Sequence, residues 1–510
     1  MKAITRRSFL KNTGAATGAI ALGTALQGGW LSCSKAQALG YFESEFGISD
    51  SLCQKALAKA LSKGGDFGEL FFEHTISNWL MLEDGKVNRA YSDVSLGVGI
   101  RTVKDDQVGY GFTQELTEES ILAAAATAAT IANANSNKPA GEFVNLKMNN
   151  YYPLKNLLTS VALESKLPLV QTTNDKCFEL SPLIIKVSAG FHDQQKRILV
   201  VTSDGTKAED LLPRNYLYAS VVAEKDGKRE RAGWNLGGRK DFSFYTTAVV
   251  DEVAKAAVDR VLVLFDAVQP PAGEMPVVLG PGVTAILLHE AIGHGMEADF
   301  NRKEQSTYCT MIGKKVAEPF VTIIDDATNP KLPGSLNVDD EGTPGQKTVL
   351  VDNGILTSYM HDKISALHYK LEPTGNGRRQ SYQHYIQPRM RNTYMLPGPA
   401  KPGDVIKSVK NGIYVQDVSN GQVNIGAGDF AFFVSQGKKI EDGKLTAPIK
   451  DINIMGNGPK MLTNITMLAD DLEMSRGGGG ACGKGGQRVP VGFGQPTCLV
   501  KSMTVGGKKA

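Results

Sequence analysis

Hydrophobic and polar residues in the first part of the chain follow first a helical and then a strand-like period. From Ser51 to Ser62 the apolar positions have helical spacing, and Lys63–Gly65 ends the pattern. Short apolar runs bounded by turn residues then predict strands at Glu69–His74, Trp79–Leu82, Leu96–Val103 and Val108–Thr113. An alanine-rich helix is expected from Thr117 to Ala134. A helix, antiparallel strands and a second helix predict an α+β module.

The pattern repeats beyond a polar segment, 136–152, that is typical of a linker. It predicts a helix that bends near Pro168, two strands, a hairpin across Asp226-Gly227 and a long helix. These helices and strands are expected at Ala162–Leu180, Leu183–Phe191, Ile198–Thr202 and Phe242–Asp266. The segment Gln269–Gly273 contains two prolines and ends the pattern, so we expect the main domain boundary there.

The rest of the chain predicts mostly β structure. A strand is expected at Met275–Leu279, then one apolar helix, then many short β runs between Gly, Pro, Asn and Asp turns. The chain has 510 residues, which exceeds what one core usually sustains, and its 55 glycines favour a β-rich fold. We therefore predict an α+β fold, with mixed α/β modules at 39–135 and 136–268 and a β-rich C-terminal domain at 272–510.

Residues 1–38 have the pattern of a twin-arginine export signal. Arg6 and Arg7 precede Phe9-Leu10, a mildly apolar stretch follows, and Ala36–Ala38 offers a cleavage site. The sequence thus predicts a periplasmic protein. A cut before Cys33 would instead leave a lipid-anchored protein, although Trp30 fits a lipobox poorly.

Composition argues against nucleic acid and against a membrane span. Residues 1–38 hold five Lys or Arg and no acidic residue, so their removal changes the formal net charge from +3 to −2. The remaining chain then has no excess of positive charge that would indicate nucleic-acid binding. No run of eighteen apolar residues suggests a transmembrane segment. Five cysteines remain after such a cut, an odd and sparse set that predicts no disulfide framework.

The most informative motif follows the apolar run Thr284–Leu288. His289, Glu290 and His294 offer two imidazoles to a metal ion and a carboxylate beside them. A lone histidine is more often structural, but two histidines and a glutamate within six residues favour a metal site. At 3.6 residues per turn, positions i and i+5 lie roughly 140° apart on a regular helix. The sequence therefore predicts either a π-bulge or a helix that ends at Gly293.

A catalytic zinc needs a third protein ligand and an open position for water. Among the remaining His, Asp, Glu and Cys residues the most suggestive is Cys482, in the glycine-rich run Gly477–Gly486. Glycines permit close approach, and Arg476 and Lys484 are expected to favour its thiolate. The same run fails as a phosphate-binding loop, because Gly485 stands where Ser or Thr is needed. The other four cysteines, Cys53, Cys177, Cys309 and Cys498, are expected to be small buried residues.

At these motifs the chain resembles the TldD/PmbA metallopeptidases, and the TldD branch in particular. The matching stretches are Leu287–Glu297, Asp339–Gly345, Pro373–Arg379, Pro388–Pro397 and Cys482–Val491, with Glu69–His74 and Leu82–Gly85 nearer the start. The resemblance implies one zinc ion per subunit on His289, His294 and Cys482, with Glu290 as the catalytic carboxylate. It also implies a homodimer, or a heterodimer with a PmbA/TldE-like subunit, that encloses short or unfolded peptides. The zinc-binding helix then lies in the β-rich domain. Leu332-Pro333 and the export signal depart from the family pattern.

The expected chemistry is hydrolysis of a peptide bond. Zinc would lower the pKa of a bound water toward ~7, and Glu290 could take its proton. The side chains of Arg378, Arg379, Tyr382 and His384 could stabilise the oxyanion or bind the peptide carboxylate, or could form a structural cluster. Two alternatives stay open. One is an HExxxH dipeptidyl peptidase with a carboxylate as third ligand, and the other is a non-catalytic regulator or binding module of the same family, whose older label is modulator of DNA gyrase.

Overall fold

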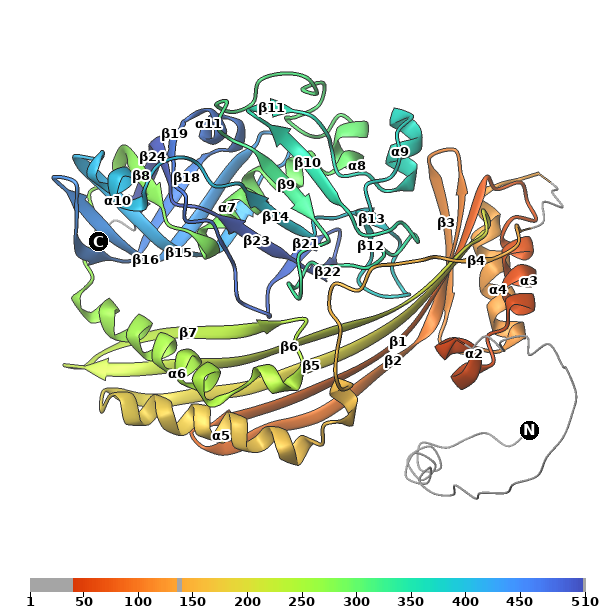
Figure 1. The fold of residues 1–510 in the computed structure, drawn as a ribbon, viewed down its shortest axis with the longest axis horizontal. Coiled ribbons are helices and arrows are strands. Elements are labelled where there is room, and N and C mark those ends of the chain that lie inside the picture. Colours follow the sequence, from red (N-terminus) through yellow and green to blue (C-terminus); the bar gives the residue numbers. More distant parts are fainter. Residues whose placement is uncertain (1–39, 135–139, 508–510) are drawn as a thin grey trace, which may run out of the picture. The chain divides into compact units, whose positions relative to one another are not determined.

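A long, curved, mostly antiparallel sheet dominates the N-terminal part of the computed structural model, which describes residues 40–134 and 140–507 (Figure 1). Its strand order is β3-β2-β1-β5-β6-β4, and β7 also pairs with β6. The strands are β1 (Phe67–Glu83), β2 (Lys86–Lys104), β3 (Gln107–Thr113), β4 (Val144–Asn145), β5 (Ile184–Thr202), β6 (Thr206–Lys225) and β7 (Lys228–Gly238).

Strand β1 shows why the sheet has two different faces. Side chains alternate between the faces of a strand, so even-numbered and odd-numbered residues point in opposite directions. Leu70 and Phe72 pack in one core with residues of helices α3 (Asp50–Ala60) and α4 (Glu118–Ala128). Leu80 and Leu82 pack in another with residues of α5 (Leu163–Leu180) and α6 (Thr247–Leu262). One face of the sheet is therefore covered by helices.

The residues on the opposite face of the sheet show that the strand boundaries predicted within β1 were wrong. The sequence predicted separate strands at Glu69–His74 and Trp79–Leu82, but β1 runs through both without a break. The polar residues between them, Thr75 and Ser77, line a cavity on the face turned toward the C-terminal domain. The predicted interruption between the two strands was wrong, because the alternating polar side chains between them form the wall of a polar cavity and not a turn. Strand β5 likewise joins the two strands expected at 183–191 and 198–202.

The helices lie close to their expected positions. Helix α4 starts after Thr117, whose side chain accepts a hydrogen bond from the main-chain N–H of Ser120, and it ends at Ala128, earlier than expected. Helix α5 continues through Pro168. The remaining short helices are α2 (Tyr41–Phe46), α8 (Ala298–Arg302), α9 (Lys363–Tyr369), α10 (Pro402–Lys407) and α11 (Gly458–Thr463).

The C-terminal domain is built on two mixed sheets, of order β11-β10-β9-β14-β23-β20 and β15-β8-β24-β18-β16-β17, with β19 paired to β24. Its strands are β8 (Gly273–Leu279), β9 (Ile323–Asp326), β10 (Lys347–Asp352), β11 (Ile355–Leu356), β12 (Gly377–Arg378), β13 (Gln387–Pro388), β14 (Asn392–Met395), β15 (Asn411–Val423), β16 (Asp429–Glu441), β17 (Lys444–Ile449), β18 (Ile452–Asn457), β19 (Ile465–Leu468), β20 (Glu473–Met474), β21 (Ala481–Lys484), β22 (Gln487–Pro490), β23 (Gly492–Gln495) and β24 (Cys498–Gly507). Leu287, Leu288 and Ile292 belong to the core that these strands share. The fold is thus α+β with a β-rich C-terminal domain, as predicted.

The expected modules do not each have a sheet of their own. Residues 39–135 supply β1 to β3 and residues 136–268 supply β4 to β7, yet β1 pairs with β5 along fifteen residues of each strand. From Tyr41 onward the chain forms one unit. A buried ion pair between Arg101 on β2 and Glu341, 2.6 Å long, also connects the long sheet to the C-terminal domain. The division at 135/136 stays a prediction.

The expected export signal and Cys33 fall in residues 1–39, outside the described part of the structure. Within the described ranges, no helix is long and apolar enough to span a lipid bilayer.

Candidate metal centre

The segment that carries both histidines is a helix with an irregular middle. It begins as α-helix α7 (Ile286–Leu288), continues as a π-helix (η6, His289–Gly293) and ends as a 3-10 turn (η7, His294–Met296). The main-chain N–H of His294 donates to the carbonyl of His289, which is the i to i+5 hydrogen bond of a π-turn. The wider turn brings residues five apart onto one side of the helix. Of the two predicted geometries, the π-bulge is the one present.

Packing explains why this turn needs a glycine. Residues Leu288, Ile292 and Met296 around the turn are buried in the C-terminal core. Gly293 lies against the Met390 side chain so closely that a Cβ atom would collide with the Met390 sulfur. A larger residue at 293 would therefore require either the Met390 side chain or the helix that carries the histidines to shift.

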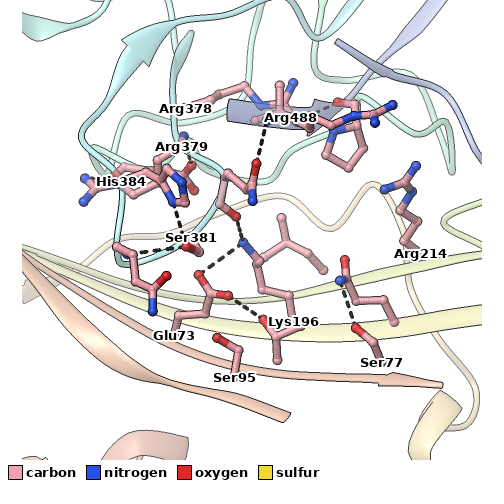
Figure 2. Close-up of a pocket in the computed structure, with 18 of the residues that line it drawn as sticks. Glu73, Ser77, Ser95, Lys196, Arg214, Arg378, Arg379, Ser381, His384 and Arg488 are labelled. Atoms are coloured by element: carbon pink, nitrogen blue, oxygen red, sulfur yellow. Dashed lines mark hydrogen bonds and ion pairs between the residues drawn. The ribbon is translucent and has the colours of Figure 1, made fainter. Parts of the chain in front are cut away.

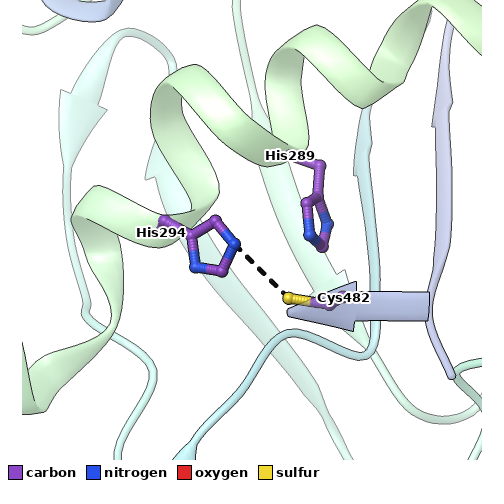
Figure 3. A group of neighbouring side chains, drawn as sticks. All are labelled: His289, His294 and Cys482. Carbon is purple, nitrogen blue, oxygen red and sulfur yellow. Dashed lines mark hydrogen bonds between the residues drawn. The ribbon is translucent and has the colours of Figure 1, made fainter. Parts of the chain in front are cut away.

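Three potential metal ligands converge at this turn. Nitrogen atoms of His289 and His294 and the sulfur of Cys482 all lie within 4.8 Å of one another (Figure 3). The Cys482 Sγ is 3.4 Å from His294 Nε2, and the two imidazole centroids are 5.2 Å apart. All three side chains are buried. They form the only such group of three or more potential ligands among the residues that the structure describes.

The donor set fits a zinc ion. Both ring nitrogens of His289 are buried, and neither has a hydrogen-bond partner. Buried polar groups are rarely left unpaired, because their desolvation costs free energy that nothing offsets. Imidazole nitrogen and thiolate sulfur are both ligands that zinc prefers, and catalytic zinc sites use three protein ligands and leave a fourth position open. The residues present therefore match the metal that the sequence predicted.

The second nitrogen of His294 is held by a buried carboxylate. Glu297 Oε2 lies 2.9 Å from His294 Nδ1, which leaves His294 Nε2 facing Cys482. Burial alone would raise the pKa of Glu297, but Lys484 and His294 lower it to about 2. Lys484 Nζ lies 3.1 Å from Glu297 and 2.7 Å from Asp299. A carboxylate on the remote nitrogen fixes the orientation of a metal-binding imidazole.

The contacts of Cys482 correct the expected roles of Arg476 and Lys484. Arg476 is half exposed and pairs with Glu252, and Lys484 is occupied by two carboxylates. Burial would raise the pKa of the Cys482 thiol, but the imidazoles of His289 and His294 hold it well below its usual range. The thiolate is therefore favoured by the two neighbouring imidazoles. The prediction that Arg476 and Lys484 favour the thiolate was wrong, because both basic side chains pair with acidic residues instead.

The long sheet positions the glycine-rich run that leads to Cys482. The Arg214 guanidinium on β6 donates to the carbonyls of Gly478, Gly479 and Gly480, at 3.0, 2.9 and 3.2 Å. A Cβ atom at Gly478 would lie only 2.5 Å from the carbonyl oxygen of Asn215. The run is thus fastened to β6 two residues before Cys482, and the N-terminal sheet contributes to the placement of a predicted ligand.

Glu290 lies beside the three donor atoms and remains in contact with solvent. Its Oε2 is 3.6 Å from His294 Nε2, and 22% of its side chain is exposed. Glu290 is therefore the acidic group at this centre that both approaches the three donor atoms and is accessible to water.

The four residues predicted to bind substrate lie in two different settings. Arg378, Arg379 and His384 line the cavity between β1 and the C-terminal domain, whereas Tyr382 is buried and is not part of that lining. Arg379 is also occupied, because its guanidinium donates to Glu69. The role of these four residues in substrate binding stays a prediction.

Comparison with known proteins decides the family. Three models of the PmbA/TldD family match the chain: "PmbA/TldA metallopeptidase domain 1" at residues 68–132, "PmbA/TldA metallopeptidase central domain" at 156–265 and "PmbA/TldA metallopeptidase C-terminal domain" at 272–507. The chain belongs to the PmbA/TldD metallopeptidase family.

Several family members are similar over most of their length. A "Metalloprotease TldD homolog" from Haemophilus influenzae is 40% identical over 87% of this chain and 93% of its own. The protein of the same name from Buchnera aphidicola (strain APS) is 38% identical over 90% and 96%. A "Zinc metalloprotease TldD homolog" from Saccharolobus solfataricus is 28% identical over 89% and 99%. The crystal structure of TldE from Thermococcus kodakarensis has the same fold, with a TM-score of 0.71 at 19% identity over 89% of this chain and 100% of its own.

Three residues of this family member escaped the sequence analysis. Glu297 stands three residues after His294, a spacing that could have indicated a carboxylate partner. Arg389 is fully buried and donates to the Cys482 carbonyl at 2.7 Å, and Arg214 fastens the glycine-rich run. Neither arginine carries a local signal, because each reaches the centre from a segment distant in the sequence.

Proposed function

We propose that this family member is a zinc-dependent peptidase that hydrolyses short or unfolded peptides. His289, His294 and Cys482 would hold one zinc ion per chain, and Glu290 would act as the general base. The observation that carries the proposal is the convergence of three buried donor atoms within 4.8 Å, with both nitrogens of His289 lacking any other partner. The relative from Saccharolobus solfataricus is named a zinc metalloprotease, which also supports zinc.

A zinc ion bound there would supply a Lewis acid for the peptide carbonyl and would acidify a water molecule. Glu290 would accept a proton at its carboxylate and pass it to the departing amine, since its side chain is beside the ligands and open to solvent. Glu297 and Lys484 would keep His294 oriented throughout. Arg389 would hold the Cys482 main chain in place.

Removal of the metal tests this proposal. We expect a chelator such as 1,10-phenanthroline to abolish cleavage of a mixed peptide library, and stoichiometric zinc to restore it, because the centre holds the residues for one ion. Zinc content measured by elemental analysis must fall and rise with the activity. Hydrolysis that continues in fully zinc-free protein would contradict the proposal. Tight peptide binding without any hydrolysis by zinc-loaded protein would favour the non-catalytic regulator instead.

We also propose that the active protein is a dimer, either of two such chains or with a PmbA/TldE-like subunit. The shared fold with TldE is compatible with such a partner. Light scattering is expected to give twice the subunit mass, alone or after co-expression with a PmbA/TldE-like chain. A monomer with full activity would rule out this proposal.

A further proposal is export to the periplasm by the twin-arginine route, supported by Arg6 and Arg7 before Phe9-Leu10. The double variant Arg6→Lys/Arg7→Lys should remain in the cytoplasm when cells are fractionated, because the pair is the core of the signal. The Lys2→Arg variant, which preserves the charge outside that core, is the matched control. Normal periplasmic recovery of the double variant would refute export by this route.

A further inference from the structure

A cavity of about 330 Å³ lies between the long sheet and the C-terminal domain. Figure 2 shows its two walls: Glu73 and Lys196 rise from the sheet, and Arg378 and Arg488 face them from the C-terminal domain. Strand β21, which carries Cys482 of the metal centre, pairs with a strand of the cavity wall. Strand β22 supplies Val489 to the cavity wall, and Val489 pairs across β21–β22 with Cys482.

The cavity has an excess of positive charge. Its lining includes six cationic side chains, Lys196, Arg214, Arg239, Arg378, Arg379 and Arg488, but only three acidic ones, Glu73, Asp93 and Asp340. Lys196 pairs with Glu73 at 3.2 Å, and Arg379 pairs with Glu69 beneath the wall. The remaining four arginines, 214, 239, 378 and 488, form no ion pair with any carboxylate of the described residues.

The guanidinium groups of these four arginines donate hydrogen bonds to neutral main-chain carbonyls or, in one case, have no hydrogen-bond partner among the described residues. Arg378 donates to the carbonyls of Met390 and Pro490, and Arg239 donates to the carbonyl of Pro213 while its Nε has no partner. Arg488 is exposed, and its guanidinium has no partner among the described residues. Burial lowers the pKa of Arg378 to about 10.

The surroundings of Arg214 also disfavour its positively charged form. Its pKa is lowered by burial and further by the neighbouring positive charges of Arg239 and Arg488.

Asp340 is the lining carboxylate whose charge acts on Arg239 and Arg378. It also faces Lys196 and Arg379. The desolvation of these clustered arginines is therefore only partly offset by a counter-charge, which is costly. An anion that entered the cavity would remove that cost, and the planar guanidinium fork suits a carboxylate.

We propose that this cavity binds a carboxylate group of the peptide substrate, with Arg488 as its accessible anchor and Arg239 and Arg378 as the buried positive wall. The inference rests on the proposed peptidase function in naming a peptide as the ligand. The cavity would hold the carboxylate while the peptide chain extends past β22 toward the metal centre. The enzyme would then prefer peptides that place a carboxylate a short distance from the cleaved bond.

Two sources of a carboxylate are chemically equivalent here, the C-terminus of a peptide and the side chain of an internal Asp or Glu. Four versions of one fluorescent peptide separate them: free acid or amide at the C-terminus, each with Glu or Gln at one internal position. Affinity is measured by fluorescence anisotropy on zinc-loaded Glu290→Gln protein, so that cleavage does not interfere. We expect the amide with Gln to bind on the order of tenfold more weakly than the best carboxylate peptide, since charge-assisted hydrogen bonds are lost.

The Arg488→Gln variant identifies the anchor. It should lower the affinity for the carboxylate peptide on the order of tenfold and leave the affinity for the neutral peptide unchanged, while Arg488→Lys should recover part of the loss. Arg89→Gln is the matched control, because Arg89 is exposed on β2 and does not line the cavity. It should bind all four peptides as the parent protein does.

Equal affinity of the parent protein for all four peptides would overturn the inference. So would an Arg488→Gln variant that weakens neutral and carboxylate peptides alike. These results are independent of the proposed function: peptide hydrolysis without carboxylate preference would leave the peptidase proposal intact, and carboxylate-dependent binding without hydrolysis by wild-type protein would refute the peptidase proposal alone.

Discussion

The Glu290→Gln variant is expected to keep its zinc and to lose about 10²–10⁴-fold in turnover of peptides. Gln is nearly isosteric with Glu but cannot accept a proton. Glu290 is not among the three convergent donors, so its replacement should leave the ligand set intact. Turnover number and zinc content are to be measured on the same preparation, together with the thermal unfolding midpoint.

The matched control is Glu372→Gln, which removes an exposed carboxylate elsewhere in the C-terminal domain and should change neither turnover nor zinc content. If the Glu290→Gln enzyme hydrolysed peptides at the wild-type rate, Glu290 would have no part in the mechanism. A loss of zinc in the same variant would mean that Glu290 contributes to metal binding instead.

The Cys482→Ala variant is expected to bind zinc at least about 100-fold more weakly than the wild type. Replacement of a residue that only orients a ligand already costs about 10–100-fold in metal affinity, so loss of the ligand itself should cost more. The measurement is the zinc dissociation constant from competition with a chromophoric chelator, which does not depend on activity. Turnover should fall with occupancy.

Cys498→Ala is the control, because Cys498 is buried in the same domain to the same degree and has no histidine beside it. Burial raises the pKa of the Cys498 thiol to about 12, in contrast to Cys482. Its variant should retain full zinc affinity. Unchanged zinc affinity in Cys482→Ala would remove the thiolate from the ligand set and return attention to a carboxylate ligand.

Local patterns were sufficient to predict the histidine helix. The i to i+5 spacing of His289 and His294 excluded a regular helix, and the π-turn satisfies that constraint. Cys482 was predicted from its chemical type and from family resemblance, and the structure places it beside both histidines. Each of these inferences depends on residue type and short-range geometry.

Properties that depend on distant segments could not be predicted. The polar residues Thr75 and Ser77 suggested a break in β1, because the sequence does not show that the strand faces a cavity. Arg476 and Lys484 were assigned to the thiolate by proximity in sequence, whereas their partners, Glu252 and Glu297, are about two hundred residues away. Arg214 reaches the glycine-rich run from the opposite side of the cavity. In each case tertiary contacts decide which partner a charged or polar side chain finds.

The most direct measurement of the central claim is the zinc K-edge X-ray absorption spectrum of the purified protein, combined with elemental analysis. We expect one zinc ion per chain, with one sulfur neighbour at about 2.3 Å and two imidazole nitrogens at about 2.0–2.1 Å, plus one further light-atom ligand. In Cys482→Ala, whatever zinc remains should lack the sulfur neighbour. Wild-type protein that binds no zinc, or whose zinc has only nitrogen and oxygen neighbours, would contradict the centre formed by His289, His294 and Cys482.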